Sequence, residues 1–374
     1  MSLLQMADDQ ALAGIAFHGV QQLPQEQWPP LEVLCEWVAR NGLIKELNAQ
    51  TTKVCKMLCD TFSEQGFDCC ILKGQANHAY YGEELGLLRA CGDVDIWVVP
   101  KDKSLKHPVK EVLTYLYKKG VVVSLCYLHV EVEPIKEVPV EVHLRPSFFN
   151  SPVRNRRFLK LFDFEKCVCQ KEIDGIMLPV LKTEYDLIFQ MNHLYRHLLD
   201  EGVGLRQVLD YFFLLRTAKL GIRNEDLGMR NEELGMRNEE LGMRNEDVGM
   251  RNDGDESLVR VMRRLGLWKF AGALMYVLHE VFAMPQEWMI CPPSAKDGQF
   301  LLNEIMTSGN FGHHDPRMAT VEGQRGKLSY QVKCAWRRFI RNTRFFTSYP
   351  EEVFWEPIAR LTHFWWRKFQ LFRV

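Results

Sequence analysis

Two aspartates separated by one residue are the side chains of this sequence best placed to hold a metal ion. Asp93 and Asp95 stand at the start of an apolar stretch, residues 94–99, that is predicted to be a strand. Because side chains alternate along a strand, both carboxylates project to one face and the apolar side chains to the other. Two carboxylates this close repel each other, and a divalent cation between them relieves the repulsion. Carboxylates and substrate phosphates are the hard oxygen ligands that Mg²⁺ prefers, so the pair predicts a magnesium site.

A third carboxylate is expected from a later strand. Residues 138–144 alternate between apolar and polar, which leaves Glu141 and His143 together on one face. If this strand lies beside the first, Glu141 completes a site in which two Mg²⁺ ions could serve a phosphoryl transfer. Glu131 and Glu133 alternate similarly and are rivals for the third position, although they lie nearer to a predicted turn. His143 is either a ligand or base on the acceptor side or, more commonly for a strand histidine beside an acid, a structural hydrogen-bonding group.

Short strands and helices must position these residues. The periodicity predicts helix over 30–65, a buried strand at 69–72 ending at a Lys-Gly turn, and a helix start at 75–81; it then predicts helix at 109–119 and strands over 121–132 and 138–144. Residues 68–145 therefore form an α+β unit with mixed strands. We expect an N-terminal helical segment (1–66), a catalytic domain with a small mixed sheet (67–180) and a mainly helical domain (181–374).

The helical half contains a seven-residue repeat at 221–254, with units such as GMRNEEL. Its apolar positions are spaced by five and two, whereas a coiled-coil seam requires spacings of three and four. This pattern favours a solvated surface insertion over a coiled-coil arm. Helices are predicted around 187–215, at 258–282, at 328–346 and at 357–372.

Composition excludes several classes of protein. The chain has 374 residues, 47% hydrophobic and 25% charged, with a net charge of −1, so it is not a uniformly basic nucleic-acid binder. The 11 cysteines include no CxxC pair, which argues against a zinc ribbon and favours reduced thiols in a cytoplasmic protein. Neither a signal peptide nor a membrane span is expected.

The C-terminal region is locally basic. Residues 325–374 contain 11 Lys or Arg against three Glu, interleaved with Trp and Phe. Such a mixture could contact a nucleic acid or a protein, although amphipathic helices that pack their aromatic side chains inward are the more common case.

The motifs together resemble a known superfamily. A glycine turn after a strand, then Gly-Asp-hydrophobic-Asp and an acid on a later strand, is similar to the DNA polymerase β-like nucleotidyltransferases. The particular form, Leu-Lys-Gly at 72–74, Gly-Asp-Val-Asp at 92–95 and Glu-Val-His at 141–143, resembles an uncharacterised nucleotidyltransferase family found in bacteria. The similarity continues through 192–197 and 202–210.

This resemblance implies transfer of a nucleoside monophosphate from a nucleoside triphosphate such as ATP to an acceptor: a small molecule, a sugar or a protein hydroxyl. Asp93, Asp95 and Glu141 would be catalytic metal ligands for Mg²⁺, with two ions when nucleotide is bound, or for Mn²⁺. Gln75 stands where most members of the superfamily have Gly or Ser. This departure favours the alternative of a non-catalytic nucleotide- or partner-binding protein that retains the fold.

Four further residues are expected to bind the nucleotide. Gly74 and Gly92 would let the backbone approach phosphate. Lys73 and Arg89 would neutralise the triphosphate, because phosphoryl transfer depends mainly on positioning and charge stabilisation.

The predicted helices that follow offer further substrate contacts. His193 and His197 share one helix face; packing is favoured for them, with contact to the nucleotide or acceptor second. Arg206 and Asp210 are also four residues apart, and they form either an ion pair on the helix or a phosphate-orienting pair.

Overall fold

A seven-stranded mixed sheet forms the centre of the computed structural model, which describes residues 2–232, 257–310 and 328–371. The strand order is β3-β4-β5-β2-β1-β7-β6; β2 pairs with β5 and β1 with β7 in parallel, and the other pairs are antiparallel. The strands are β1 (Phe67–Ile71), β2 (Val94–Pro100), β3 (Val122–Leu125), β4 (His129–Ile135), β5 (Val138–His143), β6 (Val168–Ile173) and β7 (Ile176–Leu181). The predicted α+β class with a mixed sheet is confirmed.

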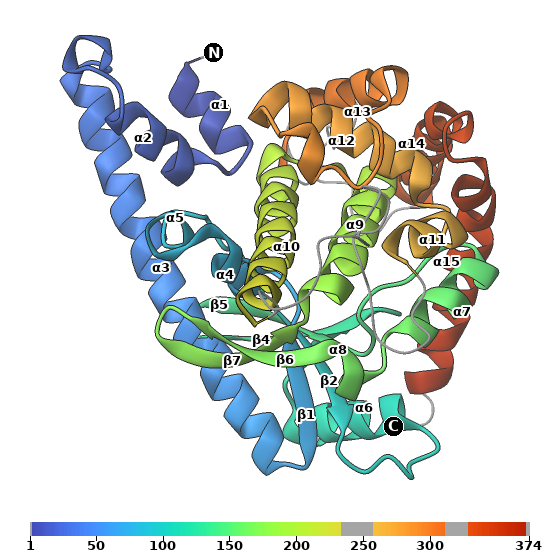
Figure 1. Ribbon diagram of the computed structural model, residues 1–374. Helices are drawn as coiled ribbons and strands as arrows, with labels where there is room; N and C mark the ends of the chain where they lie inside the picture. Colours follow the sequence, from blue (N-terminus) through green and yellow to red (C-terminus); the bar gives the residue numbers. More distant parts are fainter. Residues whose placement is uncertain (1, 233–256, 311–327, 372–374) are drawn as a thin grey trace.

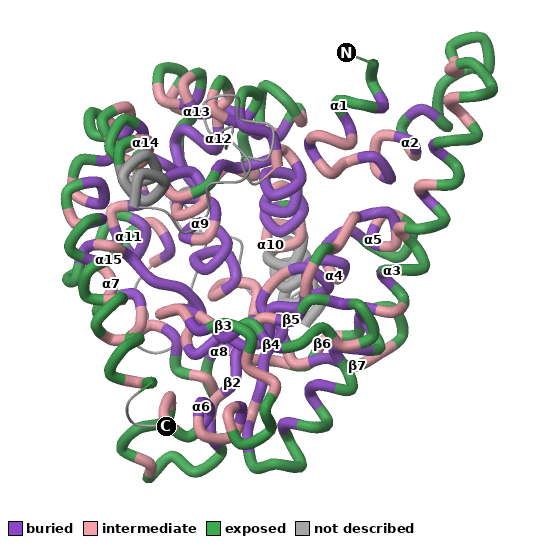
Figure 2. Tube along the Cα trace, turned by 180° about the vertical axis from the view of Figure 1, so that it is seen from behind, coloured by how far each residue is buried: buried purple, intermediate pink, exposed green. Residues whose placement is uncertain are grey.

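Helices cover both faces of the sheet (Figure 1). One face packs against α3 (Leu31–Glu64), the long helix along one side of the molecule, and α6 (Pro108–Lys119). The other face packs, through Leu72 and Trp97, against the layer containing α9 (Thr183–Asp200) and α10 (Leu205–Glu232). Figure 2 shows buried residues concentrated in α9, in the described part of α10 and in the central strands, which marks the core between sheet and helices.

The remaining helices surround this centre. They are α1 (Leu3–Asp9), α2 (Ala13–Gln21), α4 (His78–Tyr81), α5 (Glu83–Gly86), α7 (Pro152–Leu161), α8 (Phe164–Cys167), α11 (Leu258–Arg264), α12 (Trp268–Phe282), α13 (Ala295–Ser308), α14 (Leu328–Phe346) and α15 (Pro350–Leu371). Short 3₁₀ turns lie at Gln25–Gln27, Gly74–Asn77 and Gln286–Trp288. Among the described helices, none is both long and apolar enough to cross a membrane.

One prediction for the helical half is wrong, and another falls mostly outside the described residues. The final helix was expected to begin at Pro357, but α15 begins at Pro350 and contains Pro357 within it. The repeat at 221–254 was expected to be a surface insertion; α10 continues to Glu232, and the remainder of the repeat lies outside the described residues.

The C-terminal aromatic side chains divide between interior and surface. Phe345 is buried, as expected for a helix that packs inward, but Trp336, Phe339 and Trp365 are more than half exposed. The expectation that these aromatic residues pack inward is therefore met only in part.

Candidate active site

The parallel pairing of β2 with β5 brings the predicted carboxylates together. Asp95 lies directly opposite Glu141 in the register, as the sequence predicted for adjacent strands. β2 begins at Val94, where the predicted strand also begins, so Asp93 immediately precedes the strand. Its carboxylate nevertheless stays close: oxygen atoms of Asp93, Asp95 and Glu141 all lie within 4.8 Å of one another.

The three carboxylates differ in their access to solvent. The side chain of Asp95 is fully buried, whereas that of Asp93 is 34% exposed and that of Glu141 26% exposed. The rival residues Glu131 and Glu133 are exposed on β4, and neither belongs to the metal-ligating groups found in the described part of the chain. The three side chains therefore offer hard oxygen ligands, and two of them, Asp93 and Glu141, are partly exposed to solvent. Such a set fits Mg²⁺ or Mn²⁺.

Lys73 supplies a positive charge to this group. Its Nζ lies 2.7 Å from Asp95 Oδ2 and 3.7 Å from Asp93 Oδ2. Burial alone would lower the pKa of Lys73, but the carboxylates raise it above its usual value, so the ammonium group is charged at neutral pH.

The pKa values of the two aspartates are shifted in opposite directions. The negative charge of Asp95 is the main cause that raises the pKa of Asp93, against the lowering effect of Lys73. Burial would raise the pKa of Asp95, but Lys73 and a hydrogen bond with His143 lower it. Repulsion between the neighbouring carboxylates, the reason for expecting a cation here, is thus present in the folded chain.

Two histidines complete the polar cluster. His143 Nε2 lies 2.9 Å from Asp95 Oδ1, and His129 Nδ1 lies 2.9 Å from Glu141 Oε2. Burial would lower both histidine pKa values, but these carboxylates raise them, and with Cys126 they raise that of His129 to about 10. His129, which lies opposite His143 on the neighbouring strand, was not predicted from the sequence.

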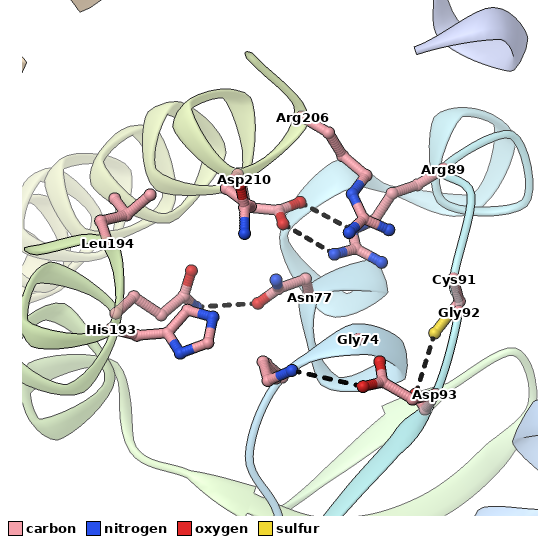
Figure 3. A pocket seen from close by; sticks show the side chains of 13 residues that line it. Gly74, Asn77, Arg89, Cys91, Gly92, Asp93, His193, Leu194, Arg206 and Asp210 are labelled. Carbon is pink, nitrogen blue, oxygen red and sulfur yellow. Dashed lines mark hydrogen bonds and ion pairs between the residues drawn. The ribbon is translucent and has the colours of Figure 1, made fainter. Parts of the chain in front are cut away.

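The backbone conformation at position 74 and the atoms around it both favour glycine. Its φ is +64°, and a Cβ there would lie 3.0 Å from Cys91 Sγ and 3.2 Å from the carbonyl oxygen of Asp93. A Cβ on Gly92, in contrast, would meet no atom within 4 Å. Both glycines line the same pocket as Asp93 (Figure 3).

Arg89 lines the candidate pocket, but its charge is engaged by a carboxylate. Its guanidinium forms two hydrogen bonds with the Asp210 carboxylate, at 2.6 and 2.7 Å, and both side chains are buried. Tyr81 also donates a hydrogen bond to Asp210, at 2.7 Å. Because Arg89 is already paired with Asp210, its neutralisation of a triphosphate remains a prediction.

Arg206 and His193 face the same pocket from α10 and α9 (Figure 3). Arg206 donates a hydrogen bond of 2.7 Å to the carbonyl oxygen of Ala90. Burial is the main cause that keeps the pKa of His193 well below its usual value, so its imidazole is neutral. The cavity between these residues measures only about 20 Å³, roughly the space of one water molecule.

Comparison with known proteins agrees with the resemblance. A family described as uncharacterised nucleotidyltransferases matches residues 1–244. The chain belongs to this family. No curated protein matches it. A crystal structure of an antigenic nucleotidyltransferase-like protein from Paracoccidioides brasiliensis is 15% identical and covers 44% of this nucleotidyltransferase and 75% of the fungal chain, with a TM-score of 0.31. At that score the similarity supports no further argument.

Proposed function

We propose that this chain is a metal-dependent enzyme that transfers a nucleoside monophosphate from a nucleoside triphosphate to an acceptor hydroxyl. The observation that supports this most is the register of β2 and β5, which places Glu141 opposite Asp95 and beside Asp93. These carboxylates would hold Mg²⁺ or Mn²⁺. When bound, the metal would neutralise phosphate charge and polarise the attacking hydroxyl.

The residues of the chain have separate tasks in this proposal. The ammonium group of Lys73 would move from the carboxylates to the incoming phosphates, because both compete for the same positive charge. Arg206, Gly74 and Gly92 line the pocket, where they would contact the triphosphate. Glu141, whose pKa is held low chiefly by His129 and His143 against the effect of burial, would be ionised, as a metal ligand must be, and would take the hydroxyl proton as the acceptor attacks.

One observation favours a second candidate, a nucleotide- or partner-binding protein without catalysis. Lys73, His129 and His143 supply up to three positive charges to three carboxylates, so the cluster is balanced without a metal. In that case the site would bind nucleotide, but metal would not change its affinity and no product would form.

Calorimetry of nucleotide binding with and without Mg²⁺ separates the two candidates. Asp93→Asn is the sharpest variant, because Asp93 is partly exposed and its loss leaves the buried partners of Asp95 intact. Glu131→Gln is the matched control, since Glu131 lies opposite Glu141 on the neighbouring strand but is exposed. The enzyme proposal expects metal-dependent binding that Asp93→Asn abolishes and Glu131→Gln preserves. Wild-type affinity that does not depend on metal would refute it.

A further inference from the structure

A second opening lies beside the carboxylates, on the side of β4. This groove has a volume of 730 Å³ and is bordered by residues of β4, α9, α14 and α15. One of its lining residues is His129, whose ring contacts Glu141. The groove shares no lining residue with the pocket that contains Lys73 and Asp93. The groove therefore reaches the carboxylate cluster through His129, on a side separate from the first pocket.

The second groove is positively charged. Arg196, Arg338, Arg360 and Arg367 line it, against the carboxylates of Asp200 and Glu201. Asp200 is engaged by two of these arginines, at 3.6 Å from Arg196 and 3.0 Å from Arg360. Within residues 2–232, 257–310 and 328–371, no carboxylate lies within ion-pair distance of Arg338 or Arg367. These two guanidinium groups are therefore available to an anion from outside.

Stacked rings make one wall of the groove rigid. The Arg145 guanidinium lies 3.6 Å from the centre of the Tyr127 ring, and the ring of His363 stacks on Tyr127 at 3.8 Å with an interplanar angle of 6°. Burial and, after it, the charges of Arg145 and Arg196 lower the pKa of His363 to about 4. His363 is thus neutral at physiological pH, and the positive character of the groove comes from its arginines.

We propose, on the basis of the nucleotidyl transfer proposed above, that this groove binds the acceptor and that the acceptor is a small phosphorylated molecule. Its phosphate would lie on Arg338 and Arg367, because guanidinium groups match phosphate oxygens in pairs. Its hydroxyl would face Glu141. The volume is that of a small-molecule site.

The reaction then balances without a further reagent. The acceptor oxygen forms a bond to the α-phosphorus of the nucleoside triphosphate as the bond from that phosphorus to the bridging oxygen breaks. Pyrophosphate leaves, and the hydroxyl proton passes to Glu141 and then to solvent.

The test uses the full chain with Mg²⁺ and a saturating non-hydrolysable nucleoside triphosphate, so that the first pocket is filled. Ribose 5-phosphate is titrated by calorimetry beside ribose, which lacks the phosphate. The wild-type protein should bind only ribose 5-phosphate, and Arg338→Glu and Arg367→Glu should each weaken binding by about tenfold or more. Arg260→Glu/Arg263→Glu, at a different surface groove, is the control and should change nothing.

Three results would overturn the acceptor assignment: equal binding of ribose and ribose 5-phosphate, wild-type affinity in the Arg338 and Arg367 variants, or tighter, arginine-dependent binding of a single-stranded oligoribonucleotide. Failure of the underlying function gives a different result. If the protein binds no nucleoside triphosphate but still binds ribose 5-phosphate through these arginines, nucleotidyl transfer is refuted and a phosphate site remains.

Discussion

Removal of the Asp210 carboxylate should be one of the most destabilising single changes in the molecule. Asp210 on α10 accepts two hydrogen bonds from Arg89 and one from Tyr81, and all three side chains are buried. Asp210→Ala leaves the guanidinium buried without a counter-charge. Breaking one partner of a buried ion pair in this way costs about 3–5 kcal/mol of unfolding free energy.

The double variant Arg89→Leu/Asp210→Leu supplies the internal check. Replacing both charged partners by apolar side chains removes the uncompensated charge, so the double variant should recover most of the loss. Asp60→Ala provides the exposed control: its ion pair with Lys56 joins side chains that are 55% and 46% exposed. Its loss should cost about 0.5 kcal/mol or less.

Urea unfolding followed by circular dichroism measures these differences through the shift in midpoint. A free energy of unfolding for Asp210→Ala within about 1 kcal/mol of the wild-type value would refute the reasoning, because the loss of one partner of a buried ion pair should cost more than this. It would also return Arg89 to the set of residues free to bind phosphate.

Three further predictions concern other sites. Burial is the main cause that raises the pKa of Asp186 from 3.8 to about 7, so the folded state retains a proton that the unfolded chain has released. Relative to Asp186→Asn, the wild-type protein should therefore lose about 4 kcal/mol of stability as the pH rises from about 4 to about 7. Urea midpoints of the two proteins that shift in parallel with pH would contradict this. Gly74→Ala forces a left-handed φ on a residue with a Cβ, at a cost of about 1–2 kcal/mol, and should weaken nucleotide binding in calorimetry; unchanged stability would show that the turn relaxes. Phe158→Ala empties a fully buried position and should cost about 3–5 kcal/mol in urea unfolding, whereas Val153→Ala, on an exposed face of the same helix, should cost far less.

The carboxylates were predictable because local rules determine their positions. Alternation in residues 138–144 fixed the face of Glu141, and the two closely spaced aspartates suggested a neighbouring carboxylate. The β6–β7 hairpin also had a local signal that was overlooked: Asp174–Gly175 is a two-residue turn with positive φ at both positions, between paired Ile173 and Ile176.

Other features depend on contacts between distant segments. The partner of Arg89 is 121 residues away in the chain, so no spacing rule pairs it with Asp210 rather than with phosphate. His129 joins the site only through its register with His143 across an antiparallel pair. Pro357 lies inside α15 although proline usually ends a helix, so sequence rules placed the start of this helix too late.

The narrowness of the first pocket has a kinetic consequence. At 20 Å³ it admits no nucleotide, and it is bridged by Arg89–Asp210 and by a 2.8 Å hydrogen bond from Gln190 to Asn77 (Figure 3). The nucleotide binding proposed above would therefore require an open conformation. The apparent affinity would then fall with the fraction of open molecules, about a hundredfold if one molecule in about a hundred is open. Variants that remove these contacts should bind nucleotide with a higher association rate although their free energy of unfolding is lower. The rate of nucleotide binding and the stability of the fold would thus change in opposite directions.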